Sequence, residues 1–469
     1  MDKDYPRILI VSPALVDEPL GAMYLSSALK QHGFVVRGSL SSQEDTERIF
    51  EEFVPDVVMF SVITGEQTHC LELCSRLKRR HPFLSVFGGF HPTLVPEILT
   101  HEAVDVIGIG EGDEAVVELA QAIKTHSSIR EIRNFWIKEK GVVYRNEVRP
   151  LVANLDALPF PDRDLFQRVP ADGEYCVFSS RGCPYDCSYC ANRPLRTLYM
   201  SKGKFVRTRS AENLMAELVE LKMHHNLKTI NFHDDIFVLD RPRLRTFVSR
   251  YRAEIGMPFI CSLRADLVNE EVATLLKQGG CAKIFMGVEA GNDKVRTELL
   301  GRRISKAQMI LARKLLGAQG IAVFTQNILG FPGTTLDNDY ETVEFNTQLK
   351  PDFAWVSIFT PYPGTRLGEQ SLREGLIDSV ESVFSTYHYR SPIRLPHRLQ
   401  VDVLHKLFSL AVDFPHLLGA IKKVVQDETH TPEELQSVFG AYRHYKYEAV
   451  FSPSLPLPPE VTAFLKRLG

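Results

Sequence analysis

Short apolar runs rich in β-branched residues alternate with helical patterns through the first 125 residues of the chain. Runs of this kind lie near residues 7–11, 34–38, 56–61, 84–89 and 104–110. Strands separated by helices form βαβ units, whose parallel sheet is covered on both faces. The pattern therefore predicts a doubly wound, Rossmann-like domain over residues 1–125, in which ligands bind beyond the carboxyl ends of the strands.

The pattern changes over residues 126–174, where a hairpin turning near Lys140-Gly141 and a Pro-rich segment predict a linker. Strands and helices alternate again over residues 175–385 in six strand-then-helix steps, which predicts a partial, TIM-like (βα)6 barrel. Residues 386–469 have helical spacing without strand alternation, which predicts a small, mostly helical C-terminal region. The chain as a whole is predicted to belong to the α/β class.

Aromatic and polar residues of the C-terminal region are able to close the mouth of the predicted barrel. They are Tyr387, His388, Tyr389, Tyr442, His444, Tyr445 and Tyr447. The alternative is a helical cap whose aromatic residues pack into a core of its own. A less favoured alternative is that the apolar, lysine-bearing segment FPHLLGAIKKVV lies on a membrane surface.

Composition narrows the classes of partner. The 469 residues include 55 Lys and Arg against 58 Asp and Glu, a formal net charge of −3. This balance does not suit a protein held to nucleic acid by bulk charge, so no nucleic-acid partner is expected. The first apolar run is broken at Ser12 and Pro13, and no apolar stretch approaches the ~20 residues that cross a bilayer. A cytoplasmic protein is therefore expected.

Three cysteines, Cys183, Cys187 and Cys190, form a C-x3-C-x2-C loop just after the first predicted barrel strand. Zinc is one candidate metal, but structural zinc needs four ligands and no second cysteine pair exists. Iron–sulfur clusters normally use four cysteine thiolates, so three suggest a cluster with one iron left open. The other five cysteines lie in predicted helices and apolar strands and are expected to be buried as small hydrophobic residues.

This loop, with Tyr189 in its aromatic position, resembles that of the radical S-adenosylmethionine (SAM) enzymes. The resemblance implies a 4Fe–4S cluster on the three cysteines, with SAM bound at the open iron. It also implies SAM contacts at the ends of the following strands, by Asp234, Asp235, Arg264, Glu289, Gly330 and Pro332. Structural roles are the alternatives: a helix cap at Asp240, an Arg–Glu ion pair across the barrel mouth, and turn chemistry in residues 330–333.

The first domain resembles the cobalamin-binding domain of the cobalamin-dependent radical SAM class, because the loops PLGAMYLSSALKQHG, FGGFHPTLVPE and IGIGEGD match in order and spacing. The resemblance implies cobalamin contacts by Ser12, Gly21, Ser61, Thr64, Gly88, Gly89, His91, Gly110, Glu111 and Gly112. A dinucleotide site is disfavoured, since residues 12–21 contain no G-x-G-x-x-G. That segment also has no histidine for cobalt, and His69 and His91 are the less favoured candidates that remain.

Together the resemblances imply a cobalamin-dependent radical SAM enzyme that methylates an unactivated carbon of a small-molecule substrate. The alternative is the same architecture catalysing oxidative cyclisation or rearrangement without methyl transfer, as in the anaerobic magnesium-protoporphyrin cyclase class. A corrinoid-binding sensor without catalysis is a remote third reading. An electron donor such as flavodoxin or ferredoxin is expected as a partner, and no residue is given a catalytic role beyond cofactor binding.

Overall fold

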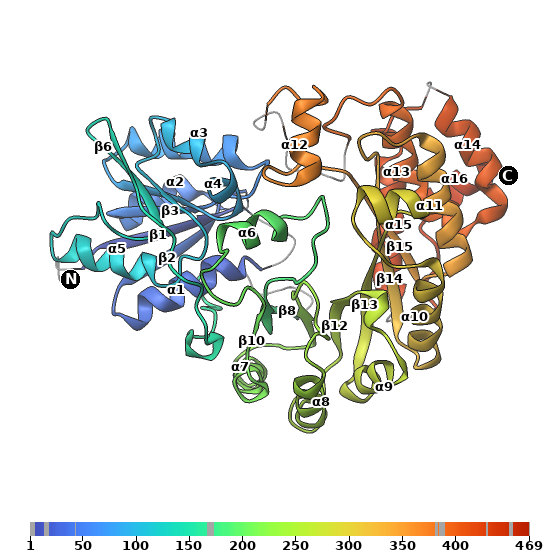
Figure 1. The fold of residues 1–469 in the computed structure, drawn as a ribbon, viewed down its shortest axis with the longest axis horizontal. Coiled ribbons are helices and arrows are strands. Elements are labelled where there is room, and N and C mark those ends of the chain that lie inside the picture. The colour runs from blue at the N-terminus through green and yellow to red at the C-terminus, as the bar shows by residue number, and fades with distance from the viewer. Residues whose placement is uncertain are drawn as a thin grey trace. The chain divides into compact units, whose positions relative to one another are not determined.

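A computed structural model describes residues 5–13, 18–42, 44–166, 173–379, 383, 390–427, 430–449 and 454–468. The chain divides into two compact units (Figure 1). Unit 1 comprises Met1–Pro184 and Ala191–Lys228, and unit 2 comprises Tyr185–Cys190 and Thr229–Gly469. The cysteine loop therefore begins in unit 1 and continues in unit 2.

Unit 1 is built around a seven-stranded sheet with the order β2-β1-β3-β4-β5-β6-β7. Its strands are β1 (Arg7–Ser12), β2 (Val35–Leu40), β3 (Val57–Ser61), β4 (Leu84–Gly88), β5 (Val106–Gly108), β6 (Phe135–Glu139) and β7 (Val142–Arg145). The strands β1 to β5 are parallel, whereas β6 and β7 form an antiparallel hairpin that turns at Lys140 and Gly141. The hairpin has the predicted position, but it also extends the sheet, because β6 pairs with β5.

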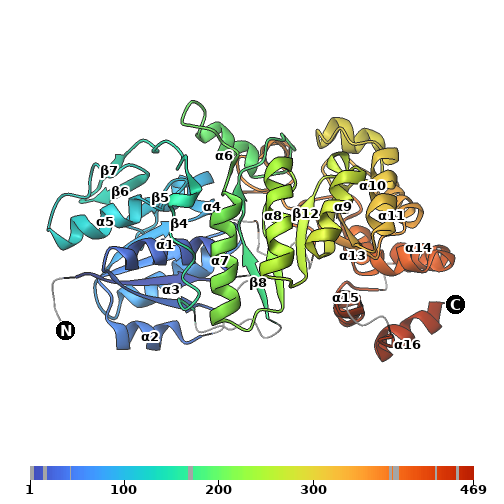
Figure 2. The ribbon, with the colours of Figure 1, turned by 90° about the horizontal axis from the view of Figure 1, so that it is seen from below.

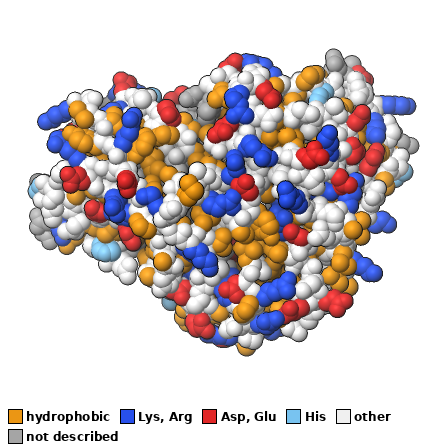
Figure 3. Space-filling view, in the orientation of Figure 1, with side chains coloured by type: hydrophobic (Ala, Val, Ile, Leu, Met, Phe, Trp, Pro, Cys, Tyr) orange, Lys and Arg blue, Asp and Glu red, His pale blue; other side chains and the backbone are white. Residues whose placement is uncertain are grey.

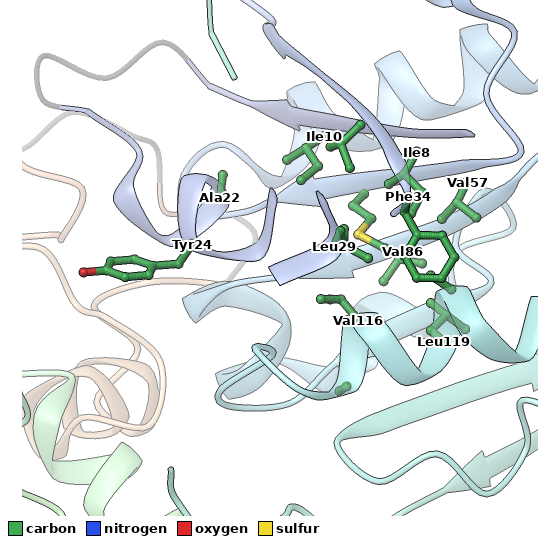
Figure 4. Packing of buried hydrophobic residues seen from close by; sticks show 14 of the residues in the cluster. Ile8, Ile10, Ala22, Tyr24, Leu29, Phe34, Val57, Val86, Val116 and Leu119 are labelled. Carbon is green, nitrogen blue, oxygen red and sulfur yellow. The ribbon is translucent and has the colours of Figure 1, made fainter. Parts of the chain in front are cut away.

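Helices cover both faces of this sheet (Figure 1). They are α1 (Leu20–Gln31) and α5 (Ala115–Lys124) on one face, and α2 (Thr46–Phe53) and α3 (Gln67–Lys78) on the other. Side chains of β1 alternate between the two faces: Ile8 and Ile10 pack against α1 and α5, as Figure 4 shows, whereas Leu9 and Val11 enter the second core. Two cores on opposite faces of one parallel sheet confirm the doubly wound fold.

The other elements of unit 1 are mostly short. They are α4 (Phe90–Leu94), β8 (Glu174–Val177), β9 (Ser180–Arg181), α6 (Asn192–Leu198), β10 (Arg207–Thr208), α7 (Ala211–His224) and 3-10 turns at Pro96–Thr100 and Leu155–Ala157. β8 is the first of the six strands predicted for the barrel. β9 pairs antiparallel with β10 and ends directly before the cysteine loop.

Unit 2 contains five parallel strands in the order β15-β14-β13-β12-β11. They are β11 (Thr229–Phe232), β12 (Phe259–Leu263), β13 (Cys281–Glu289), β14 (Ala322–Leu329) and β15 (Phe353–Ile358). Helices follow the strands in turn: α8 (Arg241–Glu254), α9 (Glu270–Gly279), α10 (Lys306–Ala318), α11 (Leu336–Leu349) and α12 (Arg366–Arg373). Figure 2 shows α8 to α11 side by side, as parallel strands joined by helices require.

The C-terminal helices share a core with the last two strands of unit 2. They are α13 (Arg398–Asp413), α14 (Leu418–Gln426), α15 (Gln436–Ala449) and α16 (Pro459–Leu468). Leu404 and Phe408 of α13 are fully buried in a cluster that includes Leu329 of β14. The Ser409 hydroxyl donates to the backbone oxygen of Ala354 in β15 at 2.7 Å. This region is therefore an integral part of unit 2.

Tyr442 and Tyr447 of α15 pack into unit 2. The Tyr442 hydroxyl donates to Asp413 Oδ2 at 2.5 Å, and the Tyr447 ring lies 5.3 Å from Phe324 and 5.9 Å from Phe353 between ring centroids. Phe324 and Phe353 lie near the amino ends of β14 and β15. Tyr447 therefore lies at the end of these strands opposite the barrel mouth, which supports the alternative of a helical cap for α15.

The other aromatic residues predicted at the mouth are in different situations. Tyr445 stacks on Tyr442 with centroids 6.0 Å apart, and His444 is 3.1 Å from Glu448 on the surface of α15. Tyr387, His388 and Tyr389 lie outside the described residues. Their proposed role at the barrel mouth stays a prediction.

Charged side chains of both signs share the surface. Figure 3 shows Lys and Arg interspersed with Asp and Glu over the face that it presents, as the small net charge of −3 suggests. Within the described ranges, no helix is both long and apolar enough to cross a membrane.

Candidate functional site

The cysteine loop begins two residues after β9. Cys187 is buried and Cys183 and Cys190 are half-buried, and none of the eight cysteines is in a disulfide. The Ser188 hydroxyl donates to the backbone oxygen of Leu299 at 2.7 Å, which anchors the loop. Among the described residues, no group of three His, Cys, Asp or Glu side chains is close enough to hold a single metal ion. The cluster assignment therefore rests on the spacing and the thiolate chemistry of the three cysteines.

The five remaining cysteines are buried, as predicted from the sequence. They are Cys70, Cys74, Cys176, Cys261 and Cys281. Burial raises the pKa of Cys70 and of Cys74 to about 12, so both are protonated at neutral pH. Protonated, buried thiols are poor metal ligands, which favours the C-x3-C-x2-C loop, with its two half-buried cysteines, as the place for iron.

Arg302 is a buried cation beside the cysteine loop, and sequence reasoning missed it. The residue is 6% exposed, and its guanidinium donates to the backbone oxygen of Gly287 at 2.8 Å. The same guanidinium lies 3.9 Å from Cys187 Sγ and 3.5 Å from the Tyr189 hydroxyl. Cysteine thiolates hold iron–sulfur clusters, and a guanidinium beside such a sulfur can donate a hydrogen bond to it. The donor set of the loop therefore fits an iron–sulfur cluster.

Glu289 ends β13 in a left-handed conformation, with a φ of 65°. The pairing with β14 shifts register between Gly287 and Glu289, and such a bulge redirects the side chain. The carboxylate lies 3.6 Å from Arg302, and burial raises the pKa of Glu289 whereas the Arg302 charge opposes that rise. Burial also raises the pKa of Tyr189 well above its usual value. A non-glycine residue at positive φ costs about 1 kcal/mol or more, and such strain is concentrated at functional sites.

Arg264, at the end of β12, is held against the cysteine loop by Tyr185. Its guanidinium lies 3.5 Å from the centroid of the Tyr185 ring. It also donates two hydrogen bonds of 3.1 Å to the two oxygens of Asp266. The acidic partner of Arg264 in the structure is therefore Asp266, and not Glu289 as in the ion pair considered from the sequence. The predicted contact of Arg264 with SAM stays a prediction.

Two neighbouring aspartates follow β11 at the positions predicted for SAM contacts. Asp234 is 3% exposed, whereas Asp235 is exposed. Asp240 caps α8 by accepting a hydrogen bond from the Arg243 N–H at 3.0 Å, as the sequence suggests. Helix capping therefore needs neither of the two aspartates.

The segment Gly330–Gly333, which includes Pro332, follows β14 beside the Tyr189–Glu289–Arg302 cluster. The Phe331 and Tyr189 ring centroids are 6.2 Å apart. Gly330 has a φ of 71°, and its N–H donates to Asp339 Oδ1 at 3.2 Å. Asp339 Oδ2 is buried without a hydrogen-bond partner in the described structure, and burial raises the pKa of Asp339 to about 7. A buried carboxylate of α11 thus supports this segment through one hydrogen bond.

Small residues leave room for a ligand at the carboxyl edge of the first sheet. Ser12 is 1% exposed, and its hydroxyl has no hydrogen-bond partner in the described structure. A Cβ atom added to Gly21 or Gly88 would meet nothing within 4 Å. Ser61 lies opposite Gly88 in the pairing of β3 with β4. An unpartnered hydroxyl and open space at one edge fit the cobalamin predicted there.

The loop after β4 is compact. Gly89 has a φ of 102°, and a Cβ atom there would lie 2.7 Å from the Val62 oxygen, so only glycine suits this position. The Thr64 hydroxyl lies 3.2 Å from His91 Nδ1, and both residues are buried. His69 Nε2 lies 3.0 Å from the Ser41 hydroxyl. Both histidines are therefore hydrogen-bonded to side-chain hydroxyls, which is the reading favoured from the sequence.

The loop after β5, Gly110–Asp113, is held by residues far along the chain. The Glu111 N–H donates to the Tyr199 hydroxyl at 2.6 Å, and the Glu111 carboxylate accepts hydrogen bonds of 2.6 and 3.0 Å from Arg207. Gly110 has a φ of 78°, and the Tyr199 hydroxyl leaves no room there for a Cβ atom. The Glu111 carboxylate is therefore engaged within the protein, and the cobalamin contacts predicted for Gly110, Glu111 and Gly112 stay predictions.

Comparison with known proteins decides the family. A profile described as B12 binding domain matches residues 6–120, and one described as Radical SAM superfamily matches residues 177–345. An uncharacterized methyltransferase of Pyrococcus horikoshii is 31% identical over 371 residues, which are 76% of this chain and 79% of the relative. This chain is a radical SAM protein with a B12 binding domain. The predicted cofactors, namely a 4Fe–4S cluster, SAM and cobalamin, are confirmed as those of this family.

Two further proteins are similar to this radical SAM protein over most of its length. The radical SAM methyltransferase TsrM of Kitasatospora setae, solved with cobalamin and a 4Fe–4S cluster, shares the fold with a TM-score of 0.67 and 18% identity over 79% of this chain and 78% of its own. The anaerobic magnesium-protoporphyrin IX monomethyl ester cyclase of Cereibacter sphaeroides is 24% identical over 81% of this chain and 64% of its own length. Similarity extends to both a methyltransferase and a cyclase.

Proposed function

We propose that this radical SAM protein methylates an unactivated carbon of a small-molecule substrate. The observation that carries the proposal is the C-x3-C-x2-C loop in a chain that also has a B12 binding domain. When bound, the cluster and SAM supply a 5′-deoxyadenosyl radical that removes a substrate hydrogen, and cobalamin supplies the methyl group. The methyltransferase names of the Pyrococcus relative and of TsrM support this choice.

Residues of the site have separate tasks in this proposal. Cys183, Cys187 and Cys190 hold the cluster, and the Arg302 guanidinium lies beside the Cys187 sulfur. Glu289 and the neighbouring Tyr189 hydroxyl present polar groups to SAM at the end of β13. Open space at Gly21 and Gly88 receives the corrin, and electrons come from a flavodoxin or ferredoxin.

The test supplies the full-length chain, reconstituted without oxygen, with hydroxocobalamin, reduced flavodoxin, a metabolite extract and SAM carrying a deuterated methyl group. We expect 5′-deoxyadenosine, S-adenosylhomocysteine and one metabolite that gains the labelled methyl group. The Cys187→Ala variant is the control and forms none of the three. If 5′-deoxyadenosine forms while no metabolite acquires label, methyl transfer is excluded.

Radical cyclisation is the second candidate, and the similarity to the protoporphyrin cyclase over 81% of this chain favours it. The same assay separates the two reactions. A cyclase yields a product that has lost hydrogen and carries no label from SAM. A corrinoid sensor, the remote alternative, would bind cobalamin and contain no iron after anaerobic purification.

A further inference from the structure

Two ion pairs within unit 1 fasten the Gly110–Asp113 loop to the strands that precede the cysteine loop. Arg181 donates from Nη1 to Asp113 Oδ2 at 2.9 Å and from Nη2 to Asp113 Oδ1 at 3.1 Å. Arg207 makes a similar two-pronged contact with Glu111. Because Arg181 and Arg207 face each other in the pairing of β9 with β10, the loop is held at two adjacent points.

Arg181 brings this connection to the cysteines. It ends β9 and stands two positions before Cys183. The intervening Gly182 has a φ of 90°, and a Cβ atom there would lie 2.5 Å from the Phe205 oxygen, so the backbone is closely confined. Arg181 is thus joined to the first cysteine of the loop by a short, closely packed backbone.

The geometry of the Asp113–Arg181 pair suits the transmission of small displacements. A two-pronged pair between guanidinium and carboxylate fixes both distance and angle, whereas a single hydrogen bond fixes distance alone. Asp113 is 7% exposed, so water has little access to its carboxylate. The Tyr24 ring of α1 lies 5.4 Å from the Arg181 guanidinium, and Figure 4 shows this buried ring extending away from Leu29. Arg181 is therefore held from two sides.

We propose that Asp113 is a positioning residue that couples cobalamin binding to the iron–sulfur cluster through Arg181. The inference rests on the proposed function, because it requires both cofactors. A ligand seated against the backbone of Gly110–Gly112 restrains the loop, and the ion pair carries that restraint to the backbone before Cys183. Binding free energies are reciprocal, so cluster loading changes the affinity for cobalamin and cobalamin changes the affinity for the cluster by the same factor.

Hydroxocobalamin is the probe, titrated by absorbance into the full-length chain with and without its cluster. The wild type should show affinities that differ by about fivefold or more between the two forms, as is usual for coupled sites. Asp113→Asn keeps the size of the side chain and removes its charge, and its two affinities should agree within about twofold.

Glu217→Gln is the matched control, because Glu217 is a 2% exposed carboxylate of the same unit that pairs with Arg163 and Arg209. This variant should keep the affinity ratio of the wild type even where it lowers stability. If Asp113→Asn does not fold, Arg181→Lys replaces it, since lysine keeps the charge but cannot form the two-pronged contact.

The outcomes separate this inference from the proposed function. If the wild type binds both cofactors and its affinity for hydroxocobalamin is the same with and without the cluster, the coupling is overturned. The proposed function is then left intact. An affinity ratio that persists in Asp113→Asn or Arg181→Lys overturns the role of the ion pair. A wild type that takes up neither iron nor hydroxocobalamin overturns the proposed function and this inference with it.

Discussion

Replacing Asp339 by asparagine should change how the stability of unit 2 depends on pH. Asp339 is 3% exposed in α11, and only its Oδ1 atom has a hydrogen-bond partner, the Gly330 N–H at 3.2 Å. Asparagine has nearly the same shape and keeps an oxygen for Gly330, but it cannot ionise. Its amide N–H₂ replaces an unpartnered oxygen and is itself buried without a partner. This lowers the free energy of unfolding by about 1–3 kcal/mol, equally at every pH.

The size of this pH dependence follows from the pKa of Asp339. Burial raises the pKa of Asp339 from 3.8 to about 7, so the folded protein binds this proton more tightly than the unfolded chain. The wild type therefore loses stability as the pH rises between these two values, and has the full loss above the upper one. At about 1.36 kcal/mol for each pKa unit, the loss is roughly 4 kcal/mol at neutral pH. The free energy of unfolding of Asp339→Asn, relative to wild type, should rise by that amount between about pH 4 and pH 8.

Urea unfolding followed by tryptophan fluorescence measures this difference. The chain has two tryptophans, and Trp355 lies in β15 of unit 2, so a Trp136→Phe background makes the signal report unit 2 alone. Asp337→Asn is the control, because Asp337 is exposed on the same helix and its replacement should give a nearly constant difference. Parallel pH profiles for wild type and Asp339→Asn would refute the reasoning.

Three further predictions concern the cofactors and the C-terminal helices. Cys187→Ala should lose most of the iron and all SAM cleavage, while Cys70→Ala keeps its iron; full activity in Cys187→Ala would overturn the cluster assignment. Paramagnetic resonance of bound cob(II)alamin should show no splitting from an axial nitrogen, because residues 12–21 hold no histidine; observed splitting would contradict this. A chain ending at residue 385 should be insoluble or melt at a lower temperature than the full chain, since α13 completes a core with β14 and β15; a truncated chain of unchanged stability would count against this.

Much of the fold is predictable because strand and helix patterns are local. The alternation over residues 175–385 predicts the strand-then-helix order that unit 2 has, and the short apolar runs place the parallel strands of unit 1. The extension of the first sheet by β6 is not predictable in the same way. It depends on pairing with β5 across about 27 residues of sequence, and a hairpin pattern does not reveal which strand it will join.

The candidate site likewise combines a local motif, which the sequence reveals, with contacts that only folding creates. The cysteine loop is a contiguous motif and is found from the sequence alone. Arg302 and Arg181 are not, since each acquires its role from a partner brought close by folding, Cys187 for one and Asp113 for the other. The strain at Glu289 is also invisible in the sequence, because a bulge in strand pairing produces it. A charged residue at a strand end is the signal that could direct attention to Arg181, whereas Arg302 lies in the segment before α10 and carries no such signal.

The position of Tyr447 bears on how this protein could acquire a new substrate. Its ring packs on Phe324 and Phe353, and Lys283 lies 4.5 Å from it, so α15 is committed to the amino ends of β13, β14 and β15. Mutations in α15 are therefore expected to act on stability, whereas mutations in the loops after the carboxyl ends, where the proposed function puts the cofactors, are expected to act on chemistry. Because these effects fall on separate residues, substitutions in the loops leave the packing of α15 unchanged. The loops can therefore diversify while the amino ends of the strands stay packed.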